Sequence, residues 1–308
     1  MRDTILYGDC RETLKKINVK VRTCVTSPPY YGLRDYGGED DQIGLEQTPE
    51  EYIDSLVKVF KEVRNVLTDD GTLWVNLGDS YYNYRPGKGQ SYPKQSVSKT
   101  TQDLPQECNK RGNKLEGLKE KDLIGIPWLF AFTMRNDGWY LRQDIIWSKP
   151  NPMPESVKDR CTKAHEYIFL FSKNKNYFYN NEAIKEPAKD WGTRDRTNGK
   201  YHNEGTGLQP HSGLTKSYPT KNKRSVWTVT NKPYKDAHFA VYPPDLIEPC
   251  IKAGSEEGDI VLDPFMGSGT TGMVARQLGR YYIGCELHKD YEKLISNRIP
   301  LSVLDLVQ

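Results

Sequence analysis

The sequence predicts an α/β fold built on a doubly wound, mainly parallel β-sheet. Two observations support this prediction. Short apolar segments typical of strands alternate with segments of helical period along most of the chain. In addition, residues 259–286 have the pattern of a strand, a glycine-rich turn, a helix and a second strand. With 308 residues, the chain can form one large domain or two smaller ones and bury a sizeable core.

The first part of the chain supplies strands and helices in turn. Each expected strand is a short apolar run that ends in polar or turn-forming residues. The helix expected over 48–67 has apolar side chains at helical spacing, with Thr48 as N-cap and Pro49 in the first helical position. It should pack on the sheet as an amphipathic helix. In chain order, we expect a strand over 4–9, a helical piece over 10–17, a strand over 20–27, the helix over 48–67, a strand over 71–82, a helix over 123–139, and strands over 141–150 and 165–173.

Regular patterning returns near the end of the chain. Residues 243–254 predict a helix closed by Gly254, and the strand over 259–263 follows it. A second helix begins after the glycine-rich turn, and residues 281–286 form the last expected strand. Helices that alternate with strands in this way favour parallel strand pairs.

Two segments lose this periodicity and carry most of the excess basic charge. Residues 85–120 hold 8 basic and 4 acidic side chains, and residues 182–235 hold 11 and 5. Together they carry +10, whereas the rest of the chain carries about −7. An acidic body with basic arms is typical of a protein that grips a polyanion, and solvated lysine-rich loops are the alternative.

Several function classes are disfavoured by composition. The six cysteines are scattered, without a close pair and without histidines at metal-ligand spacing, so we expect reduced thiols and no metal site. The N-terminus has no apolar signal region, and no apolar run is long enough to span a bilayer. We therefore expect a cytoplasmic protein without a membrane partner.

The strand over 20–27 ends in an unusual way, with a serine, two prolines and two tyrosines in residues 27–31. Prolines cannot donate to a β-ladder, so the strand stops here and a rigid loop begins. Without other information, a polyproline-like surface turn or a partner-binding segment would also explain this pattern.

The glycine-rich turn over 267–272 has the G-x-G-x-x-G spacing, follows an apolar strand and opens a helix. No lysine follows the glycines, which excludes a Walker-type phosphate loop. Glu286 ends the next strand, where a carboxylate can accept hydrogen bonds from ribose hydroxyls. A dinucleotide and S-adenosylmethionine both fit these features. The Asp263-Pro264-Phe265 sequence favours the latter, because a carboxylate suits a charged amino group better than a pyrophosphate.

The segment TSPPYYG (26–32), together with LDPFMGSGTTG (262–272), closely resembles the two signature motifs of the DNA amino-methyltransferases that use S-adenosylmethionine. The order of the two motifs resembles the permuted β class of this family. The resemblance extends to IIWSKPNPMPES (145–156) and to HFAVYPPDLIEPCI (238–251), and it covers roughly residues 1–84, 121–180 and 236–300.

The resemblance implies a seven-stranded, Rossmann-like methyltransferase fold in permuted order, with an irregular basic insertion for recognition. It also implies S-adenosylmethionine as cofactor and double-stranded DNA as partner. The implied division is a catalytic half over 1–84, a flexible basic insertion over 85–120, the remainder of the catalytic half over 121–181, a target recognition region over 182–235 and a cofactor-binding half over 236–308.

The proposed chemistry explains the composition of the proline loop. The exocyclic amine of a base is a poor nucleophile because its lone pair is delocalised into the ring. Ser27 Oγ and the carbonyl of Pro28 could accept its two N–H bonds, while Pro28 and Pro29 fix the loop. Tyr30 would stack on the extruded base, which is worth about 1–3 kcal/mol. In the family, serine in the first position accompanies cytosine N4 methylation more often than adenine N6 methylation.

Other residues take their expected roles from the resemblance. Asp9 matches a residue near the cofactor's adenine, although a helix N-cap explains it almost as well, and Asp79 could line the base pocket or serve a turn. Phe239 is favoured over His238 at the methionine end of the cofactor. The expected cofactor-binding residues are Asp9, Thr26, Phe239, Asp263, Pro264, Phe265, Gly267, Ser268, Gly269, Thr270 and Glu286. The expected DNA-binding residues are Trp147, Lys149, Asn151, Arg194, Arg196, Lys200, Lys221, Lys223 and Arg224.

Three alternatives are weaker. A non-catalytic DNA-binding or specificity subunit would tolerate loss of motif residues that are intact here. A methyltransferase of RNA or protein amides would usually place the glycine-rich motif first, and a nicotinamide-dependent dehydrogenase is the most distant alternative. The sequence leaves open the target site, a companion restriction endonuclease, and whether the protein is a monomer or a homodimer.

Overall fold

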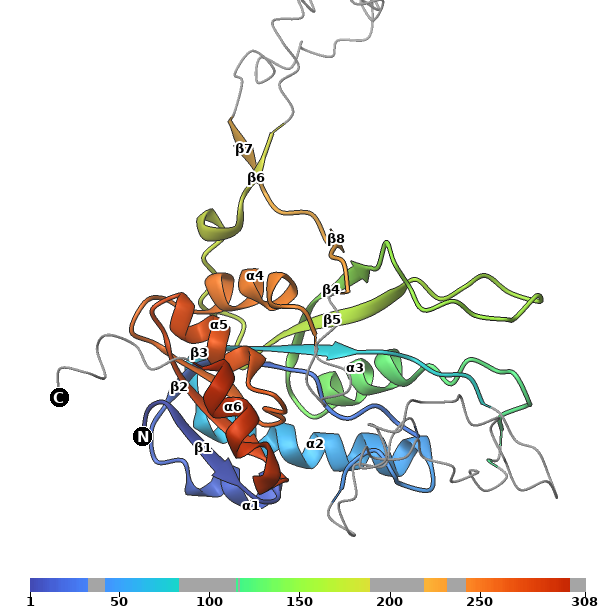
Figure 1. The fold of residues 1–308 in the computed structure, drawn as a ribbon, viewed down its shortest axis with the longest axis horizontal. Helices are drawn as coiled ribbons and strands as arrows, with labels where there is room; N and C mark the ends of the chain where they lie inside the picture. The colour runs from blue at the N-terminus through green and yellow to red at the C-terminus, as the bar shows by residue number, and fades with distance from the viewer. Residues whose placement is uncertain (33–41, 83–114, 116, 189–218, 232–241, 300–308) are drawn as a thin grey trace, which may run out of the picture.

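The computed structural model describes residues 1–32, 42–82, 115, 117–188, 219–231 and 242–299. Their centre is an eight-stranded sheet with the order β1-β10-β9-β2-β3-β5-β4-β8 (Figure 1). The strands are β1 (Thr4–Tyr7), β2 (Val21–Thr26), β3 (Leu67–Leu77), β4 (Tyr140–Ser148), β5 (His165–Ser172), β8 (Val226–Thr228), β9 (Ile260–Asp263) and β10 (Tyr281–Glu286).

The sheet is mainly parallel, as the sequence predicts. From β1 through β10, β9 and β2 to β3 every neighbouring pair is parallel. Strand β5 is antiparallel to both β3 and β4, and β8 is parallel to β4. Thus β5 alone among these eight strands runs in the opposite direction.

The eighth strand, β8, is an addition to the predicted seven. It lies within residues 182–235, for which the sequence shows no regular pattern. Trp227 explains the difference, because its indole is only 5% exposed and belongs to one of the two apolar cores. Burial of this side chain brings three residues alongside β4, where Trp227 pairs with Trp147. In the same segment, β6 (Glu186–Pro187) and β7 (Thr220–Lys221) form a two-stranded ribbon that projects from the body (Figure 1).

Helices cover both faces of the sheet, which makes the fold doubly wound. On one face, α1 (Cys10–Thr13), α2 (Pro49–Val66) and α3 (Ile126–Asn136) contribute to one apolar core. On the other face, α4 (Pro244–Gly254), α5 (Thr270–Gln277) and α6 (Glu292–Arg298) contribute to a second core. Figure 1 shows α4 and α2 on opposite sides of the sheet.

The start of α2 follows the sequence prediction closely. Thr48 Oγ1 accepts from the Glu51 backbone N–H at 3.2 Å, and Glu51 Oε2 accepts from the Thr48 N–H at 3.2 Å. This reciprocal capping box satisfies two N–H groups that the first turn leaves without helical partners. Pro49 occupies the first helical turn, as predicted.

The end of α4 also falls at the predicted residue, but for a different reason. Gly254 does not adopt a left-handed conformation. A Cβ atom at this position would lie 2.6 Å from Thr23 Oγ1 and 2.8 Å from Thr72 Oγ1. The glycine therefore allows the helix to approach β2 and β3 closely.

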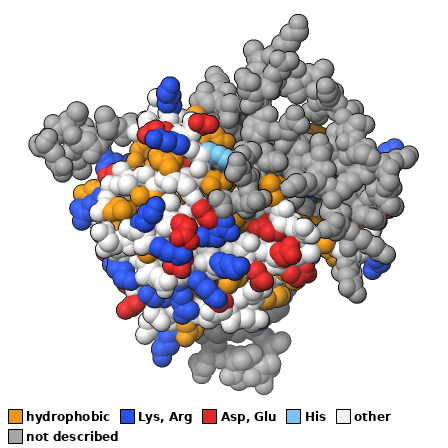
Figure 2. All heavy atoms as spheres, turned by 90° about the horizontal axis from the view of Figure 1, so that it is seen from below, with side chains coloured by type: hydrophobic (Ala, Val, Ile, Leu, Met, Phe, Trp, Pro, Cys, Tyr) orange, Lys and Arg blue, Asp and Glu red, His pale blue; other side chains and the backbone are white. Residues whose placement is uncertain are grey.

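The outer face that carries α1 and α2 shows Lys and Arg side chains interspersed with Asp and Glu (Figure 2). Lys15 and Glu12 form one such pair at 2.7 Å, and Lys61 and Asp137 form another at 3.0 Å. Exposed pairs of this kind add little to stability. Because the two signs alternate, this face does not offer a polyanion a uniformly positive surface.

The sheet order places the two sequence motifs side by side. Strands β2 and β9 are direct neighbours in the sheet. The next strand beside β2 is β3, and the next strand beside β9, in the opposite direction, is β10. In open α/β sheets, ligands bind in the crevice at such a switch in strand order, outside the carboxyl ends of the strands. Within the described residues, no helix is both long enough and apolar enough to cross a membrane.

Candidate active site

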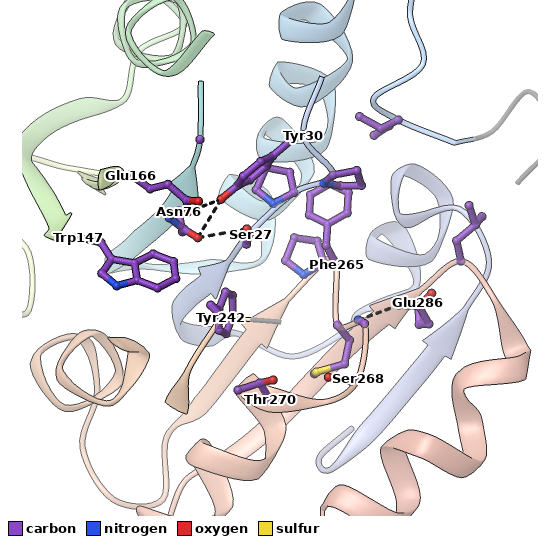
Figure 3. Close-up of a pocket in the computed structure, with 18 of the residues that line it drawn as sticks. Ser27, Tyr30, Asn76, Trp147, Glu166, Tyr242, Phe265, Ser268, Thr270 and Glu286 are labelled. Atoms are coloured by element: carbon purple, nitrogen blue, oxygen red, sulfur yellow. Dashed lines mark hydrogen bonds between the residues drawn. The ribbon is translucent and has the colours of Figure 1, made fainter. Parts of the chain in front are cut away.

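A cavity of about 700 Å³ opens at this edge of the sheet. The first wall contains the turn between β9 and α5 together with the end of β10, and the second wall contains the proline loop that follows β2 (Figure 3). Side chains that follow β3 and β4 add to the lining, as do residues that follow β1 and residues at the start of β5. A cavity of this size can hold a nucleotide-sized ligand.

The glycine-rich turn builds the first wall. Gly267 and Gly269 have φ values of 53° and 85°, which other residues rarely adopt. The Gly267 N–H donates to Glu286 Oε2 at 2.8 Å, and the His288 N–H donates to Oε1 at 3.0 Å. These bonds hold the carboxylate at the cavity, with lone pairs left to accept from a ligand.

Glu286 is 7% exposed, and this burial raises its pKa from 4.5 to about 7. The two backbone N–H groups act in the opposite direction and favour the charged form. Nearby, His288 lines the same cavity, and its Nε2 atom is buried without a hydrogen-bond partner. A ligand with hydroxyl or ring-nitrogen groups would satisfy both side chains.

The structure places Asp263, an expected cofactor residue, behind the lining of the cavity. Its carboxylate is 1% exposed and is not among the groups that line the cavity. It accepts from Thr26 Oγ1 at 2.6 Å, the Phe265 N–H at 3.0 Å, Tyr242 OH at 3.1 Å and Thr271 Oγ1. With four protein donors, the carboxylate has little capacity for a cofactor's amino group. We therefore assign Asp263 to the framework of the site.

The other expected cofactor residues fall into two groups, those that line the cavity and those that do not. Thr26 and Gly269 do not line the cavity; Thr26 binds Asp263, and Gly269 caps α5. Phe239 lies outside the described residues. The expected residues that do line the cavity are Asp9, Pro264, Phe265, Gly267, Ser268, Thr270 and Glu286.

The proline loop forms the second wall, with all four expected catalytic residues lining the cavity: Ser27, Pro28, Pro29 and Tyr30. The Tyr52 hydroxyl of α2 donates to the Pro29 carbonyl at 2.8 Å. This bond anchors the loop to the core, since Tyr52 is fully buried. The prolines themselves restrict the rest of the loop.

Tyr30 is held at both its face and its hydroxyl. Gly78 lies against the ring, because a Cβ atom there would be 2.6 Å from Tyr30 Cε2. The hydroxyl donates to Glu166 Oε2 at 2.7 Å and lies 3.2 Å from Asn76 Oδ1 (Figure 3). Burial and the neighbouring Glu166 carboxylate raise the pKa of Tyr30 well above its usual value. The phenol is therefore a fixed, neutral donor.

Sequence reasoning missed Asn76 and Glu166, which lie at the centre of this network. Asn76 Nδ2 donates to Glu166 Oε2 at 3.2 Å, and Lys149 Nζ donates to Glu166 Oε1. Glu166 is the second residue of β5, and an acidic residue just before the buried apolar run of this strand was an available signal. Tyr242, which also lines the cavity, was missed as well.

Asp9 and Asp79 each have backbone partners at a helix start, and each also lines the cavity. Asp9 caps α1 through the Arg11 N–H at 2.8 Å, and it also lines the cavity. Asp79 lines the cavity too, and its Oδ1 accepts from the Gly125 and Ile126 N–H groups at 3.0 and 3.1 Å, at the start of α3. Both carboxylates thus have structural partners.

Three expected DNA-contacting residues follow β4 or end it. Trp147 is 4% exposed, and its Nε1 donates to the Val229 carbonyl at 2.8 Å. Asn151 exchanges two hydrogen bonds with the Asn231 backbone, at 3.0 and 3.1 Å. These contacts join the end of β4 and its loop to the segment after β8, while the Lys149–Glu166 ion pair links the same loop to the network around Tyr30.

The basic residues expected in the recognition region are only partly described. Arg194, Arg196 and Lys200 lie outside the described residues. Lys221, Lys223 and Arg224 gather around the Glu186 carboxylate, with Arg224 Nε at 3.1 Å from Oε2. This cluster stands at the base of the projecting ribbon formed by β6 and β7.

The fold and the site together define a class, that of the α/β methyltransferases that modify DNA. The sequence model described as "DNA methylase" matches residues 21–297 of the chain. The chain therefore belongs to the DNA methylase family, whose members methylate the N6 or N4 amino groups of bases.

Curated relatives agree with this assignment. The Type II methyltransferase M.XycI of Xanthomonas campestris pv. cyanopsidis is 46% identical over 96% of this chain and 87% of its own length. The Type II methyltransferase M.SmaI of Serratia marcescens is 45% identical over 96% and 90%.

Solved structures share the fold. PvuII DNA methyltransferase, named as cytosine-N4-specific, matches with a TM-score of 0.62 and 20% identity over 98% of this chain and 88% of that one. A putative DNA modification methylase of Thermus thermophilus, solved with S-adenosyl-L-methionine, matches with a TM-score of 0.57 and 23% identity over 96% and 92%.

Proposed function

We propose that this protein transfers a methyl group from S-adenosylmethionine to the exocyclic amino group of a base extruded from duplex DNA, with cytosine N4 as the favoured target. One observation carries the proposal. The proline loop and the glycine-rich turn face a single cavity, although they lie at opposite ends of the chain. Such an arrangement allows a base and a nucleoside cofactor to meet.

The residues of the first wall fit the cofactor. The Glu286 carboxylate suits two ribose hydroxyls, and the buried His288 Nε2 offers a further polar contact. Phe265 and Tyr291 add apolar surface for the remainder of the molecule. When bound, S-adenosylmethionine supplies a methyl group on a sulfonium leaving group. The turn at Gly267 lets the backbone approach it closely.

The residues of the second wall fit the base. Ser27 Oγ and the Pro28 carbonyl accept the two N–H bonds of the amine and thus direct its lone pair into the cavity. Tyr30 supplies a stacking face, and its hydroxyl is tethered by Glu166. Stacking worth about 1–3 kcal/mol offsets part of the few kcal/mol needed to extrude the nucleotide. A base and a cofactor that together fill the cavity exclude water from the reacting groups.

Ser27 favours cytosine N4 over adenine N6. In adenine-specific members Asp or Asn is usual at this position, and a neutral hydroxyl accepts hydrogen bonds less strongly than a carboxylate. Ser27 Oγ also has a neutral neighbour, Asn76 Oδ1 at 3.4 Å. The amine therefore meets two neutral acceptors, Ser27 Oγ and the Pro28 carbonyl, which accords with the cytosine assignment.

The partners follow from the same proposal. Double-stranded DNA would contact the loop after β4 and the basic residues Lys221, Lys223 and Arg224, which match phosphate-binding chemistry. The relatives are named as Type II methyltransferases. A cognate restriction endonuclease and a site of action on cytoplasmic DNA are consistent with such a role.

The test is direct. Purified protein is incubated with unmethylated genomic DNA and cofactor carrying a labelled methyl group, and the digested nucleosides are identified by mass. We expect N4-methylcytosine from the wild type, formed about 100-fold or more slowly by Ser27→Ala. N6-methyladenine would correct the base, and the absence of any labelled nucleoside would overturn the proposed function.

A further inference from the structure

Asn76 at the end of β3 has an amide whose orientation is determined by its neighbours. The side chain is 4% exposed. Its Nδ2 donates to Glu166 Oε2 at 3.2 Å and to the Tyr167 carbonyl at 3.1 Å. A main-chain carbonyl can only accept, and Lys149 donates to the other oxygen of the Glu166 carboxylate. Both N–H bonds of the amide are thereby committed away from the cavity.

The opposite end of the same amide faces Ser27. Asn76 Oδ1 lies 3.4 Å from Ser27 Oγ and 3.2 Å from Tyr30 OH (Figure 3). Since Oδ1 can only accept, the single hydroxyl hydrogen of Ser27 is directed toward Asn76. The lone pairs of Ser27 Oγ then face the cavity.

We propose that Glu166 and Asn76 are positioning residues that make Ser27 an acceptor, so that the site selects bases with an amino group and rejects bases with a keto group. This inference rests on the proposed function and deepens it. An amine donates to Ser27 Oγ and to the Pro28 carbonyl. A keto oxygen in the same place faces two acceptors and leaves both unpaired.

The selectivity has a physical magnitude. A buried polar group left without its partner weakens binding by about tenfold or more. Thymine differs from cytosine at this position by a keto oxygen in place of the amine. Thymine is abundant in any DNA. A site that binds extruded bases therefore benefits from two fixed hydrogen-bond acceptors that exclude the keto oxygen of thymine.

The test compares binding of matched duplexes, after the target site has been mapped on DNA methylated by the wild type. Each duplex carries at the target position either the natural amino base or its deaminated counterpart, uracil for cytosine or hypoxanthine for adenine. An abasic site stands opposite in every case, so that the cost of extrusion is the same. We expect the wild type to bind the amino base about tenfold or more tightly.

In Asn76→Leu, Ser27 can rotate and donate, so the preference should fall to within about twofold. Cofactor affinity should remain unchanged. Asn65→Leu, an exposed change on α2, is the matched control and should keep the full preference. If Asn76→Leu has low methyl-transfer activity but binds the amino base over its keto counterpart as selectively as the wild type does, the inference is overturned. If the wild type itself transfers no methyl group, the proposed function fails instead.

A second variant keeps the test decisive if the leucine variant does not fold. In Asn76→Asp, the introduced carboxylate meets Glu166 and shares a proton with it at low pH. The shared proton restores the donor that the amide supplied. Lys149 and Lys163 provide the nearby positive charge, and Tyr30 stays neutral.

Methyl transfer by Asn76→Asp should therefore decline as pH rises, relative to the wild type, as the shared proton is lost. Thermal unfolding measured at each pH separates this effect from loss of structure. Because the aspartate oxygen that faces Ser27 accepts in both protonation states, Asn76→Asp should also keep the preference for the amino base, and loss of that preference would refute the role of Asn76. Glu166→Gln, which keeps an acceptor oxygen for Tyr30 and Asn76, should retain more activity than Glu166→Ala.

Discussion

Thr26 and Asp263 are 237 residues apart in the sequence, and a hydrogen bond of 2.6 Å joins Thr26 Oγ1 to Asp263 Oδ1. The first residue ends β2 before the proline loop, and the second ends β9 before the glycine-rich turn. This contact therefore adds to the pairing of β2 with β9 in holding the two motifs together. Tyr242 and Thr271 bind the other oxygen of the same carboxylate.

Asp263→Ala should reduce the free energy of unfolding by about 3 kcal/mol, because it leaves buried hydroxyl and N–H donors without an acceptor. Chemical denaturation measures the loss. Asp69→Ala removes a carboxylate that is 92% exposed and should change stability by less than about 0.5 kcal/mol. A loss no larger than that of the control would show that the Asp263 network is not structural.

Ser27→Ala should lower kcat for methyl transfer by about 100-fold or more, since the amine loses one of its two acceptors. Cofactor affinity, measured by calorimetry, should stay within about twofold, because Ser27 lies on the base side of the cavity. Ser296→Ala in α6, where the hydroxyl bonds only the helix backbone at Glu292, serves as the control. An equal loss of cofactor affinity in Ser27→Ala would mean that the loop has been misassigned.

Tyr30→Phe and Tyr30→Ala should separate the face of the ring from its hydroxyl. The phenylalanine variant keeps the stacking surface and loses the bond to Glu166, so we expect about a tenfold loss in kcat/KM. The alanine variant also loses stacking and should fall by a further factor of about 10 to 100. Transfer rates on duplex DNA measure both. Equal rates for the two variants would exclude a stacking role.

Glu286 gives the protein a pH dependence whose sign follows from its raised pKa. The pKa is about 7 in the folded chain and 4.5 for the ordinary group. The stability linked to this group is fully present below pH 4.5 and is lost as pH rises through 7, at a cost of about 3 kcal/mol. Glu286→Gln lacks this titration. Between about pH 5 and 8, the unfolding free energy of the wild type should therefore fall relative to that of the glutamine variant.

Cofactor binding should show the opposite trend for the same residue. Ribose hydroxyls donate to the ionised carboxylate, so the affinity of the wild type should increase as pH rises through about 7. The glutamine variant should bind about tenfold more weakly above that pH and show a flatter profile. Calorimetry at several pH values checks this, and parallel profiles for the two proteins would rule out contact between Glu286 and the ribose.

Local signals in the sequence predicted the fold and the position of the site. Glycines at 267 and 269 and prolines at 28 and 29 restrict the backbone wherever they occur, so their effect does not depend on distant residues. The capping box at Thr48 is equally local. These features, together with the alternation of helices and strands, were enough to place both motifs at strand ends.

Residues whose role depends on distant partners were harder to predict. Asp263 has the sequence context of a ligand-binding carboxylate, but its donors Thr26 and Tyr242 come from other parts of the chain. Asn76 and Glu166 meet only because β5 runs antiparallel beside β3. Strand direction is not encoded in an apolar run, so no reading of either segment alone reveals their contact.

The pairing of β1 with β10 has a consequence for how the protein is made. Asp3 Oδ1 accepts from the Tyr282 N–H across 279 residues of sequence. At about 5–20 residues per second, a ribosome needs on the order of tens of seconds to deliver the second strand after the first. During that time the nascent β1 has no neighbour, and the nucleoside side of the cleft is incomplete. The enzyme should therefore acquire its cofactor only after the residues of β10 have emerged.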